Sequence, residues 1–385
     1  MAETRKLSRA LAWLLVPGSL LLGCGAEFDP PTEVKSLRIM GVQKDKPYAT
    51  PGETVNFTML WHDGSPLVDP LDPSKRAVQI GWFGPCINPP FDSYAACGAA
   101  LQAQQSNDDP TDDLVTGDGS KFRITIPDRA DLLHPNQDPK QPNYAVVYVF
   151  FAACAGVLGP SQDPTFPAGC YAPDDTTFSR PLLSDDFVAG YSAIYVFEAE
   201  KAYRNTNPII GGWVTQGSPT NDPAVVCVGD ECLGTCDEPG ADGSPGLCHN
   251  RLPIVDDADA DAVAAYCDAN PKFCVPACPD DGDPIECPEY DVHPSMDRAA
   301  NSEPDQITNE NYGHSYGEQM WIDYYSSRGA MKSPTKLLND ATSGWNSGYG
   351  TSFLAPKETG AVQVWAAVHD NRGGVAWSGI TLIVR

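Results

Sequence analysis

The chain has 385 residues, with 51 Asp and Glu against 25 Lys and Arg, and a formal net charge of −26 at pH 7. Such an acidic chain repels nucleic acids and bare anionic lipid headgroups, and the sequence contains no basic cluster. We therefore expect no nucleic-acid partner. Gly and Pro are abundant and long helical periodicity is almost absent, so strands and loops should dominate a chain long enough for two domains.

The first residues predict export. Arg5, Lys6 and Arg9 precede a short apolar run, Leu11 to Gly23. A basic start, a short apolar run and small residues before a cleavage point are typical of a secretory signal. The run is shorter than the roughly 20 apolar residues of a spanning helix. Residues 1–23 are therefore expected to be a signal peptide rather than a core helix.

The end of this run resembles the lipobox of bacterial lipoproteins, in which a Leu stands three residues before a lipidated Cys. The matching residues are Leu21, Leu22, Gly23 and Cys24. The resemblance implies that Cys24 becomes the first residue and carries diacylglyceryl and palmitate-type acyl chains. Several such chains give durable anchoring. Gly25 follows where Asp would signal inner-membrane retention, so the resemblance implies the outer membrane, with residues 24–35 as lipidated N-terminus and tether.

Strand signals begin at residue 36. Short runs rich in Val, Ile, Tyr and Phe are separated by loops rich in Pro, Gly and Asp. In residues 54–61, for example, Val55, Phe57 and Met59 alternate with polar residues. Alternation of this kind predicts a β-sandwich, which we place at residues 36–206. The polar Asn/Pro joint that follows marks the boundary of a second domain, residues 207–385.

The end of the chain predicts a hairpin with the sequence DNRGG as its turn. Its two strands weakly echo the first domain, because GAVQVWAAV (360–368) matches YAVVYVFFA (144–152) and AWSGITLIV (376–384) matches YSAIYVFEA (191–199). The chain resembles the large lipoproteins of Gram-negative bacteria that are built from immunoglobulin-like domains, and this resemblance brings no known activity. We expect a mainly β fold of two tandem immunoglobulin-like β-sandwiches.

The second sandwich is expected to carry a disulfide-rich acidic insertion at about residues 217–312. Residues 222–287 hold fifteen acidic residues against Arg251 and Lys272, and have too little aliphatic content for a core of their own. Lipidation of Cys24 leaves an even number of the 13 cysteines, which in an exported protein favours disulfides.

In the first domain the spacing suggests the local pairs Cys86/Cys97 and Cys154/Cys170. The eight cysteines of the insertion allow 105 connectivities, and two C-x₃-C spacings also fit zinc ligation, which export disfavours. These cysteines are Cys227, Cys232, Cys236, Cys248, Cys267, Cys274, Cys278 and Cys287.

Part of the insertion invites a calcium interpretation. Asp257, Asp259, Asp261 and Asp268 stand at positions one, three, five and twelve of a calcium-loop pattern. Position six, however, is Ala262 instead of the Gly that the turn needs, and no Glu closes the loop. We prefer a helix over the Ala-rich sequence ADAVAAYCDA, with Ca²⁺ elsewhere in the acidic insertion left open.

Two further motifs have alternative interpretations. The sequence GHSYG places Ser315 in the G-x-S-x-G pattern of serine hydrolases, with His369 or Asp370 as possible partners, but the polar residues before it do not fit a buried strand. Trp345, Tyr349 and Phe353 could stack on sugars or a partner, although we favour core packing for them.

The sequence therefore predicts a lipid-anchored, non-catalytic binding or structural module with an unidentified protein or glycan partner. The alternatives are a calcium-dependent adhesion or surface-assembly protein, and a secreted hydrolase that uses Ser315.

Overall fold

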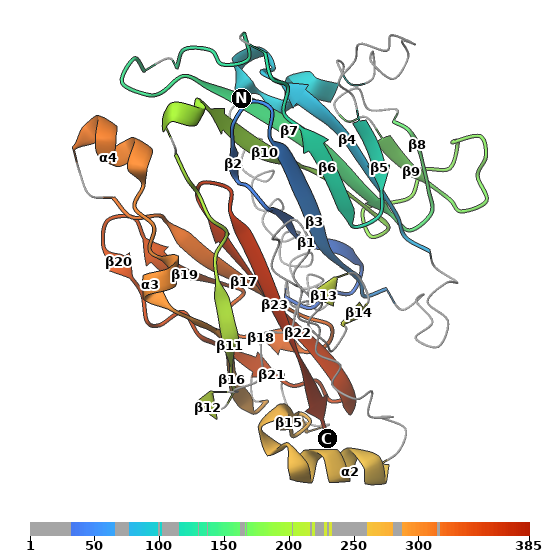
Figure 1. Ribbon diagram of the computed structural model, residues 1–385. Helices are drawn as coiled ribbons and strands as arrows, with labels where there is room; N and C mark the ends of the chain where they lie inside the picture. The colour runs from blue at the N-terminus through green and yellow to red at the C-terminus, as the bar shows by residue number, and fades with distance from the viewer. Residues whose placement is uncertain are drawn as a thin grey trace, which may run out of the picture.

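The computed structural model describes residues 32–65, 77–98, 101, 115–129, 131–136, 138–161, 166, 168–201, 203–215, 218–219, 227–228, 231–232, 260–279, 287–313 and 316–385. Over these residues the protein is mainly β, and its strands form two sandwiches, the first in the upper right of Figure 1 and the second in the lower left. None of the helices in these ranges has the length and apolarity needed to cross a membrane.

The first sandwich packs a three-stranded sheet (β1-β3-β6) against a five-stranded sheet (β2-β10-β7-β4-β5). Its strands are β1 (Leu37–Lys44), β2 (Tyr48–Ala49), β3 (Thr54–Asp63), β4 (Gln79–Ile87), β5 (Val115–Asp118), β6 (Lys121–Thr125), β7 (Tyr144–Cys154) and β10 (Phe187–Phe197). The connections contain the ribbon of β8 (Val157–Pro160) and β9 (Ala168–Tyr171), and the 3-10 turns η2 (Pro90–Asp92), η3 (Tyr94–Ala96) and η4 (Ala199–Lys201).

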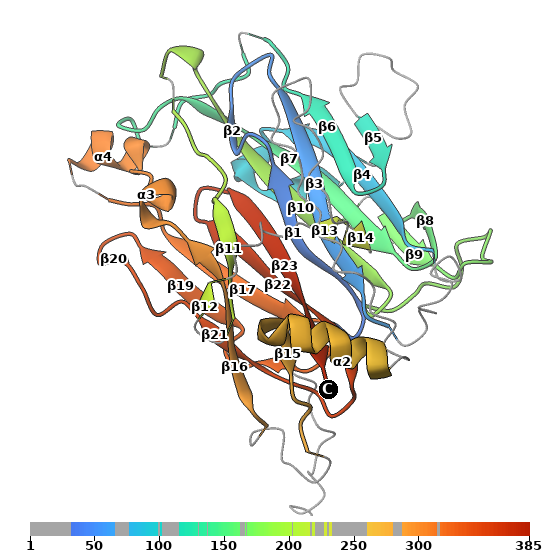
Figure 2. The same ribbon diagram turned by 60° about the horizontal axis from the view of Figure 1, so that its bottom comes forward.

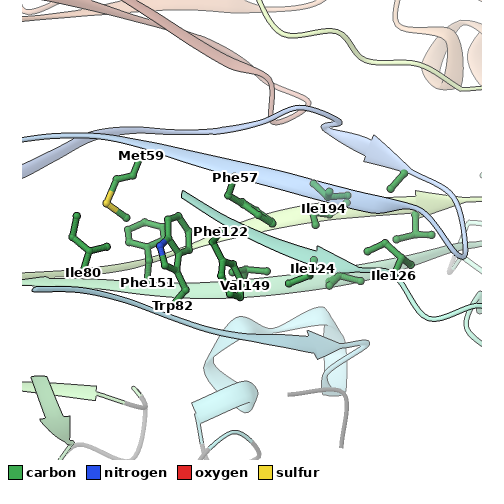
Figure 3. Close-up of a cluster of buried hydrophobic side chains, with 14 of the residues drawn as sticks. Phe57, Met59, Ile80, Trp82, Phe122, Ile124, Ile126, Val149, Phe151 and Ile194 are labelled. Atoms are coloured by element: carbon green, nitrogen blue, oxygen red, sulfur yellow. The ribbon is translucent and has the colours of Figure 1, made fainter. Parts of the chain in front are cut away.

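The core of this sandwich lies between its two sheets (Figure 3). Alternate residues of β3 point inward, as period-two patterning requires, so Phe57 and Met59 are buried. Trp82 of β4 stacks on Phe122 with ring centroids 5.4 Å apart, and its indole N–H donates to the carbonyl of Gly119 at 2.8 Å. A fully buried Trp thus has its polar group satisfied.

The second sandwich packs a five-stranded sheet (β12-β11-β16-β21-β18) against a six-stranded sheet (β15-β23-β22-β17-β19-β20). Its strands are β11 (Ile210–Thr215), β12 (Ser218–Pro219), β15 (Cys274–Val275), β16 (Glu289–Met296), β17 (Met320–Ser326), β18 (Ala330–Met331), β19 (Thr335–Asp340), β20 (Gly344–Trp345), β21 (Thr351–Leu354), β22 (Gly360–Asp370) and β23 (Val375–Val384). The other elements are the ribbon of β13 (Cys227–Val228) and β14 (Glu231–Cys232), the helices α2 (Ala260–Ala269), α3 (Arg298–Asn301) and α4 (Gln306–Tyr312), and the turn η5 (Pro271–Phe273).

The two sandwiches share one strand order, which is that of immunoglobulin-like domains. In the first sandwich β1 pairs with β3, and β10 pairs with β7, which pairs with β4. In the second, β11 pairs in the same way with β16, and β23 pairs with β22, which pairs with β17. A short early strand also runs parallel to the last strand, as β2 does beside β10 and β15 beside β23. The echoing segments occupy matching places, since β7 and β10 correspond to β22 and β23.

The structure corrects the extent of the insertion expected at residues 217–312. Within that range β16 pairs with β11 and β21, and its Val292 and Met296 are buried in the second core. The sequence EYDVHPSM does alternate polar and apolar residues, but the proline within it argues against a central strand. Phe273 and Val275 also join that core, so this part of the segment packs on the sandwich instead of relying on disulfides alone.

Four disulfides lie in the described residues. Cys86–Cys97 and Cys154–Cys170 are the two local pairs that spacing suggested, and each clips a connection of the first sandwich. In the second sandwich Cys267 bonds Cys274, and Cys278 bonds Cys287. Zinc ligation by the Cys274-x₃-Cys278 spacing is therefore excluded. Cys227 and Cys232 face each other in the register of β13 and β14, while Cys236 and Cys248 lie outside the described residues.

The tether expected at residues 24–35 is attached to the protein at its far end. The backbone of Thr32 and Val34 hydrogen-bonds both ways with Ser326 of β17, at 2.9 and 2.8 Å. The Thr32 hydroxyl accepts from the amide of Met331 at 2.9 Å. The chain therefore contacts the second sandwich before it enters the first, a pairing that no local pattern in the sequence indicates.

The two sandwiches are joined by an apolar contact. β1 lies beside β23 in both ribbon views (Figures 1 and 2). Met40 and Leu60 of the first sandwich pack against Trp365 and Trp377 of the second in one buried cluster. Gly41 allows the close approach, because a Cβ there would lie 3.3 Å from the Trp377 ring. The extensive apolar burial favours a fixed angle between the sandwiches.

Candidate binding site between the two sandwiches

A groove with a volume of about 460 Å³ lies where the two sandwiches meet. The first sandwich contributes residues of β1 and β10, and the second contributes β17 and the turn between β22 and β23. Its lining includes Lys44, Tyr191, Tyr195, Trp321, Asn371 and Arg372. The volume falls in the range of small-ligand sites, which often form at domain interfaces.

A network of buried polar groups forms the floor of the groove. Lys44, at the end of β1, is 3% exposed and donates to the carbonyl of Ala193 at 2.5 Å. The carboxylate of Asp370 accepts the backbone N–H groups of Arg372 and Gly374, at 2.7 and 2.9 Å, which fixes the hairpin turn. Lys44 and the turn that Asp370 fixes both line the groove, so one end of each sandwich lies there.

Arg372 ties this turn to two acidic residues. Its Nη2 lies 3.1 Å from Oε2 of Glu303 and 3.1 Å from Oε1 of Glu318, and the contact with Glu318 lacks hydrogen-bond geometry. Asn205, in the connection between the sandwiches, donates to Asp370 at 3.3 Å, and Asn207 donates to the carbonyl of Lys44 at 2.5 Å. The polar joint recognised in the sequence therefore contacts both sandwiches.

Burial shifts the proton affinities of this network. It raises the pKa of Glu318 to about 9, with the Asp370 carboxylate adding to the rise and the Arg372 guanidinium opposing it. It lowers the pKa of Lys44 to about 8, an effect that Asp370 partly offsets. Burial therefore favours the protonated form of Glu318, and the Arg372 guanidinium 3.1 Å away favours the ionised form.

Aromatic side chains form the walls. Tyr191 and Tyr195 alternate on the outer face of β10 and are 43% and 40% exposed. Trp321 of β17 is half-buried and stacks on His369 with centroids 5.3 Å apart. Burial lowers the pKa of His369, although Asp323 and Asp370 oppose the shift. The solvent-facing part of the groove is therefore aromatic, with Asn371 as an exposed amide.

The aromatic wall continues beyond the groove. Tyr94, in the connection clipped by Cys86–Cys97, stacks on Tyr191 with centroids 4.1 Å apart and planes 23° from parallel. Phe91, three residues earlier, is 98% exposed and has a left-handed backbone conformation with φ of 59°. Asp92 holds this segment, because its carbonyl accepts from the Tyr148 hydroxyl at 2.8 Å and its carboxylate accepts from the Tyr144 hydroxyl.

The sequence did not single out these residues. Lys44 ends an ordinary strand pattern, and Tyr191 and Tyr195 read as one face of β10. The DNRGG turn was recognised only as a turn. The available signals were the Tyr residues at alternate outward-facing positions and two Asn residues in the inter-domain joint. Neither signal indicates a groove unless the angle between the two sandwiches is known.

The calcium-loop residues do not converge where the structure describes them. Asp261 and Asp268 are exposed residues of α2, the helix expected over ADAVAAYCDA. Seven residues of helix separate them by about 10 Å along its axis, too far to share one ion. Asp257 and Asp259 lie outside the described residues. Within the ranges that the structure describes, no group of three or more His, Cys, Asp or Glu is placed to hold a metal.

The hydrolase motif also lacks its expected setting. Ser315 lies outside the described residues, but the residues before it form helix α4, which ends at Gly313 with φ of 67°. Strand β17 follows. A nucleophile elbow needs a strand before the Ser and a helix after it, and here the order is reversed.

The other sequence candidates have simple outcomes. Phe353 is fully buried in the second core, and Trp345 and Tyr349 pack against that core, as we favoured. Cys24 and the remaining lipobox residues lie outside the described residues, so lipidation stays a prediction.

No protein-family model and no curated protein matches the chain. Searches of solved structures align it to the D0-D1 domain of intimin at 8% identity, covering 89% of this chain and 98% of that one, with a TM-score of 0.16. Latent dimeric PorU from Porphyromonas gingivalis aligns at 10% identity over 92% of this chain and 24% of that one, with a TM-score of 0.17. Three N-terminal domains of the Hoc capsid protein of bacteriophage RB49 align at 8% identity over 91% of this chain and 99% of that one, with a TM-score of 0.15. Such low scores support no conclusion, and the immunoglobulin-like description depends on strand order alone.

Proposed function

We propose that this protein is an exported, lipid-anchored binding module, and that its ligand site is the groove between the two sandwiches. The observation that carries this proposal is the groove itself, a concave site of about 460 Å³ with aromatic walls and a polar floor drawn from both sandwiches. Sites that combine apolar walls with a few fixed polar groups are typical of ligand binding.

The arrangement favours binding over catalysis. The three charged residues of the lining, Lys44, Asp370 and Arg372, are at most 7% exposed and are engaged by protein groups. A general acid, base or nucleophile must reach the reacting atom of a substrate. These groups instead fix the shape of the groove, which is the requirement of a preorganised binding site.

The anchoring part of the proposal depends on the lipobox resemblance at Cys24. The full chain should be expressed in a Gram-negative host and its N-terminal peptide analysed by mass spectrometry. We expect a diacylglyceryl group on Cys24 and recovery in the outer-membrane fraction. A Cys24→Ala variant should lose both. An unmodified Cys24 in the wild type would contradict this part.

The binding part is tested by filling the groove. Ala193 lies between Tyr191 and Tyr195 on β10 and lines the groove. An Ala193→Trp variant should occupy the space, whereas Ala193→Ser changes it little. With unlipidated protein (residues 25–385), binding to cell-envelope fractions of the host should fall at least tenfold for the Trp variant and persist for the Ser variant. Equal binding by both variants, with equal thermal stability, would refute a role for the groove.

A further inference from the structure

We propose that the groove and the aromatic surface beyond it bind a neutral glycan chain. This inference depends on the proposed function, because it names the ligand of the same site. The aromatic track is defined by Trp321, Tyr195, Tyr191, Tyr94 and Phe91. It begins in the groove on the second sandwich and continues over β10 to the connection after β4.

The residues of the aromatic track are held in place by stacking, by a disulfide and by hydrogen bonds. Tyr191 lines the groove and stacks on Tyr94, so the two surfaces are continuous. The Cys86–Cys97 disulfide and the hydrogen bonds to Asp92 fix the connection that carries Tyr94 and Phe91. Phe91 and Asp92 both have positive φ, 59° and 51°. Such backbone strain in a well-anchored connection is typical of functional segments.

The chemistry of the exposed groups suits sugars. Aromatic rings offer flat apolar faces to the C–H faces of pyranose rings. Tyr hydroxyls and the side-chain N–H groups of Asn371, whose oxygen accepts from the Gln319 amide at 3.0 Å, offer hydrogen bonds to sugar hydroxyls. Rigid aromatic groups also lose little conformational freedom on binding. Three of the track residues are Tyr or Trp at intermediate to high exposure in or beside the groove: Tyr191, Tyr195 and Trp321.

Charge selects a neutral ligand. The only charged residues in the groove lining are Lys44, Asp370 and Arg372, and each is bonded within the protein. An anionic chain would find no unengaged cation there and would approach a protein of net charge −26. A cationic chain would be attracted by that net charge at long range, an effect that salt screens, but in the groove it would find the Asp370 carboxylate already occupied by backbone N–H groups. A neutral ligand needs no counter-charge.

Size favours a glycan chain over a folded protein. A stable protein–protein contact needs a broad surface of about 800 Å² on each partner. The groove is instead a local hollow, and its volume of about 460 Å³ is in the range of small-ligand sites. An extended chain of sugar rings can fill the groove and continue along the stacked Tyr94 and Tyr191.

Calorimetric titration tests this inference. Unlipidated protein would be titrated with a panel of neutral hexasaccharides (cellohexaose, maltohexaose, laminarihexaose and mannohexaose), and with hexagalacturonate and chitosan hexamer as anionic and cationic probes. We expect at least one neutral hexasaccharide to bind, and the charged probes to bind at least tenfold more weakly.

Matched Trp variants locate the site. Trp321→Ala should weaken binding of the neutral hexasaccharide about tenfold, which is the loss of roughly one stacking interaction. Trp345→Ala removes a Trp of similar exposure from β20, the edge strand of the same sheet, and should leave affinity unchanged. Tyr191→Ala, which leaves Trp321 and its His369 contact in place, should weaken binding to a similar degree as Trp321→Ala.

The outcomes separate the two proposals. If only a charged probe binds, and this binding is lost in Ala193→Trp, the neutral glycan is overturned and the groove is kept as a binding site. Failure of every neutral hexasaccharide at millimolar concentration would also overturn the inference. If envelope binding in addition survives Ala193→Trp, the proposed function fails as well.

Discussion

The replacement Glu318→Gln tests the physical description of the buried network. Glu318 is 3% exposed, and its Oε1 lies 3.1 Å from Arg372 Nη2. Because burial raises its pKa to about 9, the folded protein holds a proton there that the unfolded chain releases above about pH 4.3. The stability that this proton provides is therefore complete at low pH and is lost progressively as the pH rises towards 9.

The glutamine side chain of the variant would be neutral in both the folded and the unfolded state, so this pH-dependent loss of stability would disappear. The free energy of unfolding of the variant, relative to wild type, should rise by about 1.4 kcal/mol per pH unit between pH 5.5 and 7.5, the value for one proton. Above pH 8 the lowered pKa of Lys44 adds an opposite trend in both proteins.

The assay is urea unfolding of both proteins at pH 5.5, 6.5 and 7.5, followed by tryptophan fluorescence. Glu289→Gln is the control, because Glu289 is an exposed partner of Lys332 whose pKa is lowered instead. That variant should show no gain with rising pH. A Glu318→Gln variant that is less stable than wild type at pH 7.5, or whose difference does not grow with pH, would show that Glu318 is ionised in the folded protein and refute the reasoning.

Three further predictions concern packing and cross-links. Trp377→Ala removes a buried ring from the contact between the sandwiches and should lower the free energy of unfolding by about 3–5 kcal/mol. Calorimetry should then resolve two transitions, and a single unshifted one would contradict a coupled interface. Replacing both Cys86 and Cys97 with Ser opens an 11-residue loop and should cost about 3 kcal/mol, with faster proteolysis of that connection; unchanged resistance would count against it. Thr32→Val leaves the buried amide of Met331 without its acceptor and should lower the free energy of unfolding by about 1–3 kcal/mol. Hydrogen exchange of the Met331 amide should then become faster. An unchanged exchange rate would show that the N-terminal segment is not docked.

Much of the first sandwich and the final hairpin followed from the sequence. The strand β7 reads as a continuous apolar run because both of its faces are covered, one by the core and the other by the connection that Cys86–Cys97 clips. Likewise β22 and β23 are buried on both faces, by the second core and by the first sandwich. Strong local patterns predicted these strands correctly, but not what covers their outer faces.

Weak local patterns failed. In β16, Tyr290, Val292 and Met296 alternate with polar residues, but Pro294 argues against a central strand, so tertiary pairing with β11 and β21 decides the conformation. The short helix α4 is fixed by an Asp305 side chain that accepts from the Thr308 amide, a cap that is easily missed in a polar stretch.

The candidate site was beyond sequence reasoning for a geometric reason. Lys44 and Arg372 lie at opposite ends of the chain and meet only because Met40, Trp365 and Trp377 fix how the two sandwiches pack. The sequence motifs that were chosen for their chemistry are local, whereas the groove is assembled from turns and strand ends of both sandwiches.

The most direct test of the central claim is hydrogen–deuterium exchange of the unlipidated protein, with and without solubilised neutral polysaccharide from the host envelope. The groove predicts slower exchange in β10 around Tyr191–Tyr195 and in the turn from Asp370 to Gly374, on both sandwiches at once. Protection confined to residues 217–287, or absent from both sides of the groove while binding persists, would contradict the claim that the ligand binds between the sandwiches.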